Sequence, residues 1–125
     1  MRGPKPKLID STDAIAVVPK PPRWMATAAK AEWRRIMPVL VERRILTAAD
    51  IASVENFCVA VGRARELEVR IQEAEDVDPV LIRLQDKAMQ TARQLAAELG
   101  LTPVSRSRPS VRGERADEDD NPLAV

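Results

Sequence analysis

The stretch TAADIASVENFCVAVGRARELEVRIQEAE, residues 47–75, determines the fold class. It opens with Thr47 and, three residues later, Asp50, a variant capping box whose side chains satisfy free backbone groups at a helix start. Apolar residues then recur at steps of three or four without a proline, at Val54, Phe57, Val61, Ala64, Leu67 and Ile71. This period predicts one continuous helix from about 48 to 75.

Two further helices are predicted on either side of this stretch. The first runs from about Thr27, whose hydroxyl is expected to cap it, to about Arg43, with a kink at Pro38 because the apolar period continues past the proline. The other spans about 79–99, from the Asp78-Pro79 start to the Gly100 stop. Its apolar seam consists of Leu81, Leu84, Ala88, Ala92, Leu95 and Leu99. A second apolar line beside the seam consists of Ile82, Met89 and Ala96.

The length of the central helix has a consequence for assembly. About 28 residues at about 1.5 Å each make a helix roughly 42 Å long, whereas a compact 100-residue domain has a radius of gyration of about 13 Å. We therefore expect an all-α fold, a kinked N-terminal helix plus a long antiparallel helical hairpin, completed by oligomerisation. The alternative is a monomeric three-helix bundle with a frayed central helix.

The composition argues against catalysis. The 125 residues include no His and one Cys, which excludes His-based acid–base chemistry, Cys/His pairs and the usual zinc ligand sets. We interpret the acidic group at 73–78 as a solvated turn rather than a metal site, and Cys58 as a small buried residue. With no signal-peptide pattern and no long apolar run, we expect an intracellular protein with no cofactor and no membrane partner.

Charge and proline are unevenly distributed along the chain. The net charge of +1 combines +3 over residues 1–23, −1 over 24–100, +3 over 101–116 and −4 over 117–125. Proline-rich or single-sign segments cannot offset their ordering entropy. We therefore expect a disordered basic arm at 1–23, a helical oligomerisation core at 24–100, and a disordered tail at 101–125 that is basic and then acidic.

Basic residues gather in the arm, on the first helix and at the start of the tail, and DNA phosphates require such local positive charge. The candidate DNA-binding residues are Arg2, Lys5, Lys7, Lys20, Arg23, Lys30, Arg34, Arg35, Arg43, Arg44, Arg106, Arg108 and Arg112. The acidic end is suited to docking on a basic groove of a partner, through Asp117, Glu118, Asp119, Asp120, Asn121, Pro122 and Leu123. Simple solvating tails are the alternative. Trp24 is expected to anchor the first helix, and Trp33 to lie in or at the edge of the core.

Several short motifs, in fixed order over about 100 of the 125 residues, resemble the phage terminase small subunit family. They are RGPKPK at 2–7, PPRW at 21–24, the Trp-x-x-x-x-Pro-x-Leu pattern at 33–40, the Leu-Thr-x-x-Asp start at 46–50, LGLTPVSR at 99–106, and the acidic then Asn-Pro ending at 119–123. Two features depart from the family pattern. The turn at 73–78 is short where a Gly-rich segment is common, and Arg44 stands where glycine is often found.

The resemblance implies a ring-forming, non-catalytic subunit that recognises viral DNA and recruits and stimulates the large terminase subunit, which carries the ATPase and nuclease. Expected partners are double-stranded viral DNA, the large subunit, further copies of the chain and, as an additional candidate, the portal. The expected location is the host cytoplasm during phage assembly, not the mature virion. A dimeric helix-turn-helix transcription regulator and a structural coiled coil without a nucleic-acid role stay open as alternatives.

Overall fold

The computed structural model describes residues 13–102, and all regular structure in that range is helical. The elements are α2 at Thr27–Glu42, the 3-10 helix η1 at Ala48–Asp50, α3 at Ile51–Glu73 and α4 at Pro79–Glu98. The predicted all-α fold is confirmed. None of the helices described is long and apolar enough to cross a membrane.

Helix α2 carries the densest apolar stripe of the structure. Its buried residues follow helical spacing and so share one face; they are Ala29, Glu32, Trp33, Ile36, Met37 and Leu40. The helix continues through Pro38, which is exposed, as the unbroken period predicted. The predicted cap at Thr27 is wrong: Thr27 is already helical, and the N-cap position falls on Ala26, which offers no side-chain hydrogen bond.

The predicted capping box at the second helix start is confirmed. The backbone N–H and the hydroxyl of Thr47 both donate to Oδ2 of Asp50, at 2.8 and 3.0 Å. This first turn is a 3-10 turn, so α3 itself begins at Ile51, and it ends at Glu73, two residues before the predicted end. At Ala74 the backbone becomes extended and starts the short connection to α4.

Both predicted ends of the third helix are also confirmed. Oδ1 of Asp78 accepts hydrogen bonds from the backbone N–H groups of Val80, at 3.0 Å, and Leu81, at 3.4 Å, with Pro79 as the first helical residue. At the other end Gly100 has a φ of 74°, in the left-handed region that favours glycine. The N–H of Leu101 returns to the Ala96 carbonyl at 2.8 Å, the Schellman arrangement that stops a helix.

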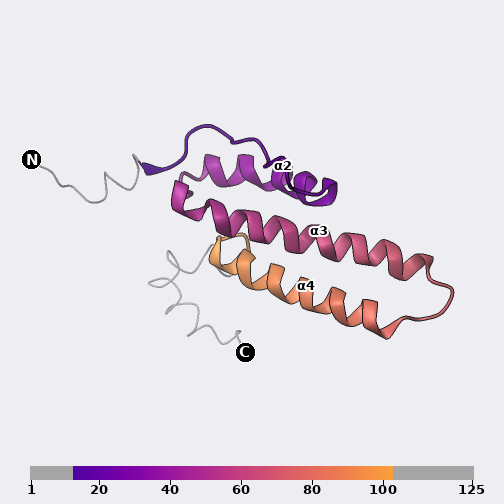
Figure 1. The fold of residues 1–125 in the computed structure, drawn as a ribbon. Helices are drawn as coiled ribbons and strands as arrows, with labels where there is room; N and C mark the ends of the chain where they lie inside the picture. Colours follow the sequence, from indigo (N-terminus) through magenta and orange to yellow (C-terminus); the bar gives the residue numbers. More distant parts are fainter. Residues whose placement is uncertain (1–12, 103–125) are drawn as a thin grey trace, which may run out of the picture.

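Helix α3 lies between α2 and α4, and the chain reverses direction at each connection (Figure 1). The main helix contacts pair α3 with α2 and α3 with α4. The α2–α3 approach is closest at Gly62, where a Cβ would lie 2.8 Å from the backbone nitrogen of Ala29. Only glycine fits there without displacing backbone. The three helices therefore form an open layer with α3 in the middle.

Helix α4 buries much less of itself than α2 does. Among its residues only Gln85 is buried, and its Nε2 donates to the Ala64 carbonyl at 3.2 Å and to Oε1 of Glu68 at 2.8 Å. Of the predicted seam, Leu99 is buried and Ala92 and Leu95 pack against the core, whereas Leu84 is 50% exposed. Because two apolar lines run along α4, the helix turns the strip between them toward α3, and Leu84 and Met89 lie on opposite flanks of that contact.

The segment before α2 is fastened to the core. The N–H of Ile15 donates to the Leu46 carbonyl at 2.8 Å, and Nε1 of the buried Trp33 donates to the Pro19 carbonyl at 2.8 Å. We expected disorder throughout residues 1–23. Within the described part of this arm, residues 13–23, Ile15 and Pro19 have defined contacts with the core. The expected packing of Trp24 is wrong: it is 64% exposed, because the neighbouring Met25 takes the buried place.

Candidate nucleic-acid interface

Seven of the candidate DNA-binding residues fall within the described range. They lie on the segment before α2, on α2 itself and in the turn after it: Lys20, Arg23, Lys30, Arg34, Arg35, Arg43 and Arg44. The remaining candidates, Arg2, Lys5, Lys7, Arg106, Arg108 and Arg112, lie outside the described residues, as does the docking segment from Asp117 to Leu123. The structure therefore describes only the candidates that lie just before α2, on α2 and in the turn after it.

Helix α2 has three of the candidate basic residues, Lys30, Arg34 and Arg35, and Arg35 reaches the α2–α3 contact, where it bonds Glu32. Arg34 and Arg35 are exposed and Lys30 is half-buried, while the apolar stripe between them faces inward. This division is what helical periodicity produces when one face is apolar and the other charged. The charged residues on the exposed side of α2 are thus Arg34 and Arg35, which are basic, and Glu42, which is acidic.

The two arginines after α2 have different surroundings. Nη1 of Arg43 donates to the Gly100 carbonyl at 2.7 Å, so this side chain ties the end of α2 to the end of α4. Arg44 is exposed and has a φ of 59°, a conformation that costs a non-glycine residue about 1–2 kcal/mol. Here an arginine makes the bend at the position where the resembled family often has glycine.

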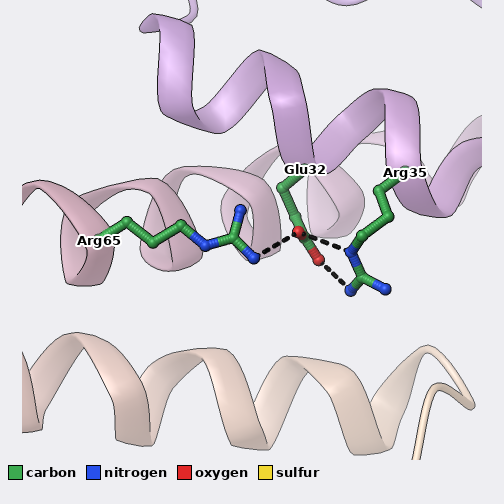
Figure 2. Close-up of polar contacts among 3 residues, drawn as sticks. All are labelled: Glu32, Arg35 and Arg65. Carbon is green, nitrogen blue, oxygen red and sulfur yellow. Dashed lines mark hydrogen bonds and ion pairs between the residues drawn. The ribbon is translucent and has the colours of Figure 1, made fainter.

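A buried carboxylate joins α2 to α3 (Figure 2). Glu32 is 1% exposed, and Arg35, three residues later, holds it with two hydrogen bonds, one of them from Nε to Oε1 at 3.0 Å. Nη2 of Arg65, from α3, lies 3.2 Å from the same Oε1. The hydrogen bond to Glu32 raises the pKa of Arg35 above its ordinary value, so the Arg35 guanidinium stays charged.

Arg65 was missing from the sequence prediction, although the sequence contains a signal for it. Glu32 stands inside the apolar stripe of α2, between Ala29 and Ile36, and a carboxylate at a core position requires a cationic partner. The pattern did not identify that partner because it lies 33 positions away on another helix. Arg35 and Arg65, together with the Glu32 carboxylate that both contact, are called the arginine pair below.

Cys58, on the α3 side of the same contact, is fully buried, as predicted. Burial, and then the nearby negative charge of Glu32, raise the pKa of its thiol to about 12. A thiol that stays protonated is a poor nucleophile. In the part of the chain that the structure describes, no group of three or more acidic or Cys side chains is arranged to hold a metal ion.

Two grooves run along the flanks of the α3–α4 hairpin. One, the Leu84 groove, has a volume of about 710 Å³ and its lining includes Val59, Leu67, Leu84, Ala88 and Leu95. The other, the Met89 groove, has a volume of about 570 Å³ and its lining includes Phe57, Val61, Met89, Ala92 and Ala96. Leu84, Ala88 and Leu95 of the first predicted line thus border one groove, and Met89 and Ala96 of the second line border the other, together with Ala92 of the first line.

One of the comparisons with known proteins found a match. Over residues 29–116 the chain matches a family model described as phage terminase, small subunit. No match was found among curated proteins or among solved structures. The matched span is more than half of the chain and includes almost all of α2, the whole of α3 and α4, and the arginine pair. The chain therefore belongs to the phage terminase small subunit family, with a role in phage DNA packaging.

Proposed function

We propose that the chain is the ring-forming, non-catalytic component of a phage DNA-packaging motor, which recognises viral DNA and recruits and stimulates the large terminase subunit. It would act in the host cytoplasm during assembly and be absent from the mature virion, with the portal as a further candidate partner. The observation that carries this proposal is the family match over residues 29–116. The exposed arginines of α2, Arg34 and Arg35, support the DNA contact.

Ring formation is supported by the apolar surface that one copy leaves uncovered. Leu84 and Met89, on opposite flanks of α4, are 50% and 45% exposed, and Val77 and Val80 at the tip of the hairpin are exposed as well. A ring requires two different surfaces on each copy, because head-to-tail contacts close the circle. The two grooves along α4 supply two such surfaces.

Native mass spectrometry of the full chain at micromolar concentration tests the assembly directly. We expect one closed oligomer with a fixed number of copies. A monomer under these conditions would contradict ring formation, and a dimer that prefers a short palindromic duplex would favour the helix-turn-helix regulator instead.

The link to the large subunit is tested at the acidic end of the chain. We propose that residues 117–125 dock on a basic surface of the large subunit, since an acidic block followed by Pro122 and Leu123 suits such a groove. Deleting these residues should abolish stimulation of the large subunit's ATPase while leaving the oligomer and DNA binding intact. Unchanged stimulation would refute this docking role.

A further inference from the structure

The arginine pair has more positive charge than the fold requires. Burying a carboxylate costs several kcal/mol, and a buried ion pair is seldom better for stability than a well-packed apolar residue. Arg35, which holds the buried Glu32 carboxylate with two hydrogen bonds, already neutralises its charge. The second cation, Arg65, leaves the group with a net charge of +1.

Resting on the DNA-packaging role proposed above, we propose that Glu32 positions Arg35 and Arg65 as a clamp for one backbone phosphate of viral DNA. Arginine suits this task because its planar guanidinium binds two phosphate oxygens at once. Its long side chain has many rotamers, however, so a fixed carboxylate that holds each head in place reduces the entropy lost on binding.

The geometry brings the two heads together at one point. Nε of Arg35 and Nη2 of Arg65 both contact Oε1 of Glu32, at 3.0 and 3.2 Å. The two heads are therefore close together, since these nitrogens are at most about 6 Å apart. Because Glu32 takes the single N–H of Nε, a phosphate would be bound through the remaining Nη hydrogens of the two heads. Figure 2 shows the two heads on either side of the carboxylate, one from each helix.

Both heads keep donors for a ligand. A guanidinium has five N–H donors, of which Glu32 uses only some, and neither arginine has another hydrogen bond within residues 13–102. The side chains of Arg35 and Arg65 are 65% and 54% exposed, whereas that of Glu32 is 1% exposed. The acceptor is thus inside the protein, and in a single copy the unused donors are accessible from solvent. Because Arg65 borders the Met89 groove, a neighbouring copy that packs on Met89 must leave this border open.

The surrounding charges favour an anion. Arg34, also exposed, precedes Arg35 on the outer side of α2. One turn beyond Arg65 lies the acidic Glu68, but the Gln72 and Gln85 amides hold its carboxylate at 2.6 and 2.8 Å, and it makes no ion pair with Arg65. Glu68 keeps its negative charge, but Arg34, Arg35 and Arg65 outnumber it around the clamp.

The first arm of the test removes one side of the clamp while Glu32 keeps its partner Arg35. The Arg65→Gln variant of the full chain is compared with Arg83→Gln, which removes the same charge from an exposed position on α4. Affinity for a fluorescent duplex is measured by anisotropy over a range of salt concentrations. We expect about tenfold weaker binding for Arg65→Gln, with the salt slope reduced by about 0.9, the value of one lost phosphate contact. Arg83→Gln should change affinity less than about twofold.

The second arm uses Glu32→Gln, for which the clamp and simple charge attraction predict opposite changes in DNA affinity. This variant retains both arginines and makes the protein more positive, so unoriented attraction predicts tighter DNA binding. The clamp predicts weaker binding, by about threefold or more, because the heads lose the group that positions them. Circular dichroism and native mass spectrometry of each variant verify that fold and oligomer are unchanged.

The outcomes separate this inference from the proposed function. If the unmodified chain binds DNA and Arg65→Gln matches Arg83→Gln, or Glu32→Gln binds more tightly, the clamp is refuted and the packaging role stands. If the unmodified chain binds no duplex even at low salt, DNA recognition by this chain is refuted, and the clamp with it.

Discussion

The two helix contacts of this molecule differ in how completely they are buried. Between α2 and α3 the core is finished: Trp33, Met37, Val54 and Cys58 are almost inaccessible, and the backbones meet at Gly62. Between α3 and α4 the only buried residue of α4 is Gln85, and Leu84 and Met89 lie about half exposed on the two flanks. The first contact resembles the core of a monomer, and the second resembles part of a larger interface.

The difference separates stability from assembly. Apolar area removed from water is the main favourable term in folding, so most of what stabilises one copy should come from the α2–α3 contact. The flanks of α4 keep about half of the Leu84 and Met89 side chains in water, and that area is gained only when something covers them. Substitutions in the two contacts should therefore affect different measurements.

The largest effect is expected from Trp33→Ala. It removes the largest buried side chain of the α2–α3 contact and its hydrogen bond to Pro19, and such truncations cost about 3–5 kcal/mol. The matched control is Trp24→Ala, which removes the same side chain from a position 64% exposed and should cost less than about 0.5 kcal/mol. Urea denaturation followed by circular dichroism at fixed protein concentration measures both. Equal losses of stability in the two variants would show that the α2–α3 contact is not the main source of stability.

The next effect is expected from Gly62→Ala. In a helix interior alanine is favoured over glycine by about 1 kcal/mol, so propensity alone predicts a gain in stability. The added Cβ would lie 2.8 Å from backbone nitrogen and 3.0 Å from Cα of Ala29, and pushing two helix backbones apart costs about 1–3 kcal/mol or more. We expect a net loss of about 1–2 kcal/mol in the same urea assay. A gain would show that α2 and α3 pack less closely than described.

A smaller effect should appear on raising the pH. The pKa of the Cys58 thiol rises from 9.0 to about 12 in the folded chain, so the fold favours the protonated form. This contribution to stability is complete below pH 9 and is lost as the pH rises from 9 toward 12. At pH 10 the loss relative to pH 8 should be about 1 kcal/mol. Cys58→Ala, measured at both pH values, should lack this component; an equal loss in the variant would assign it to other groups.

The helix ends were the most predictable part of the fold, because they depend on local chemistry. The Thr47–Asp50 box and the Asp78 cap involve side chains within a few residues of the backbone groups that they satisfy, and the Gly100 stop depends on the backbone conformation of one residue. Thr27 shows the limit of such signals: a hydroxyl at the start of an apolar period acts as a cap only if its own residue stays outside the helix.

Contacts between helices were less predictable. The pattern on α4 contained two apolar lines, and periodicity does not say whether one line or the strip between them faces α3. The side-chain amide of Gln85 decides this, since it bonds the Ala64 carbonyl. For the arginine pair, Arg35 was identified as a basic residue on α2, but its relation to Arg65 depends on the α2–α3 packing, which no local motif encodes.

The smallest change in the stability of a single copy is expected from substitutions on the flanks of α4, and these are the most informative about the surface left open beside the α3–α4 contact. Leu84→Lys and Met89→Lys each place a charge on one flank of α4, where the present side chain is about half exposed. Lysine can extend its charged end into water, so the loss of stability of one copy should stay within about 0.5 kcal/mol. In a ring either charge would enter a contact between copies and go without a partner, which costs far more than the surface change. Native mass spectrometry should then show smaller species for both variants, whereas Arg83→Gln leaves the oligomer unchanged. If only one variant dissociates, a single flank carries the contact, and two identical flanks facing each other give a dimer rather than a closed ring.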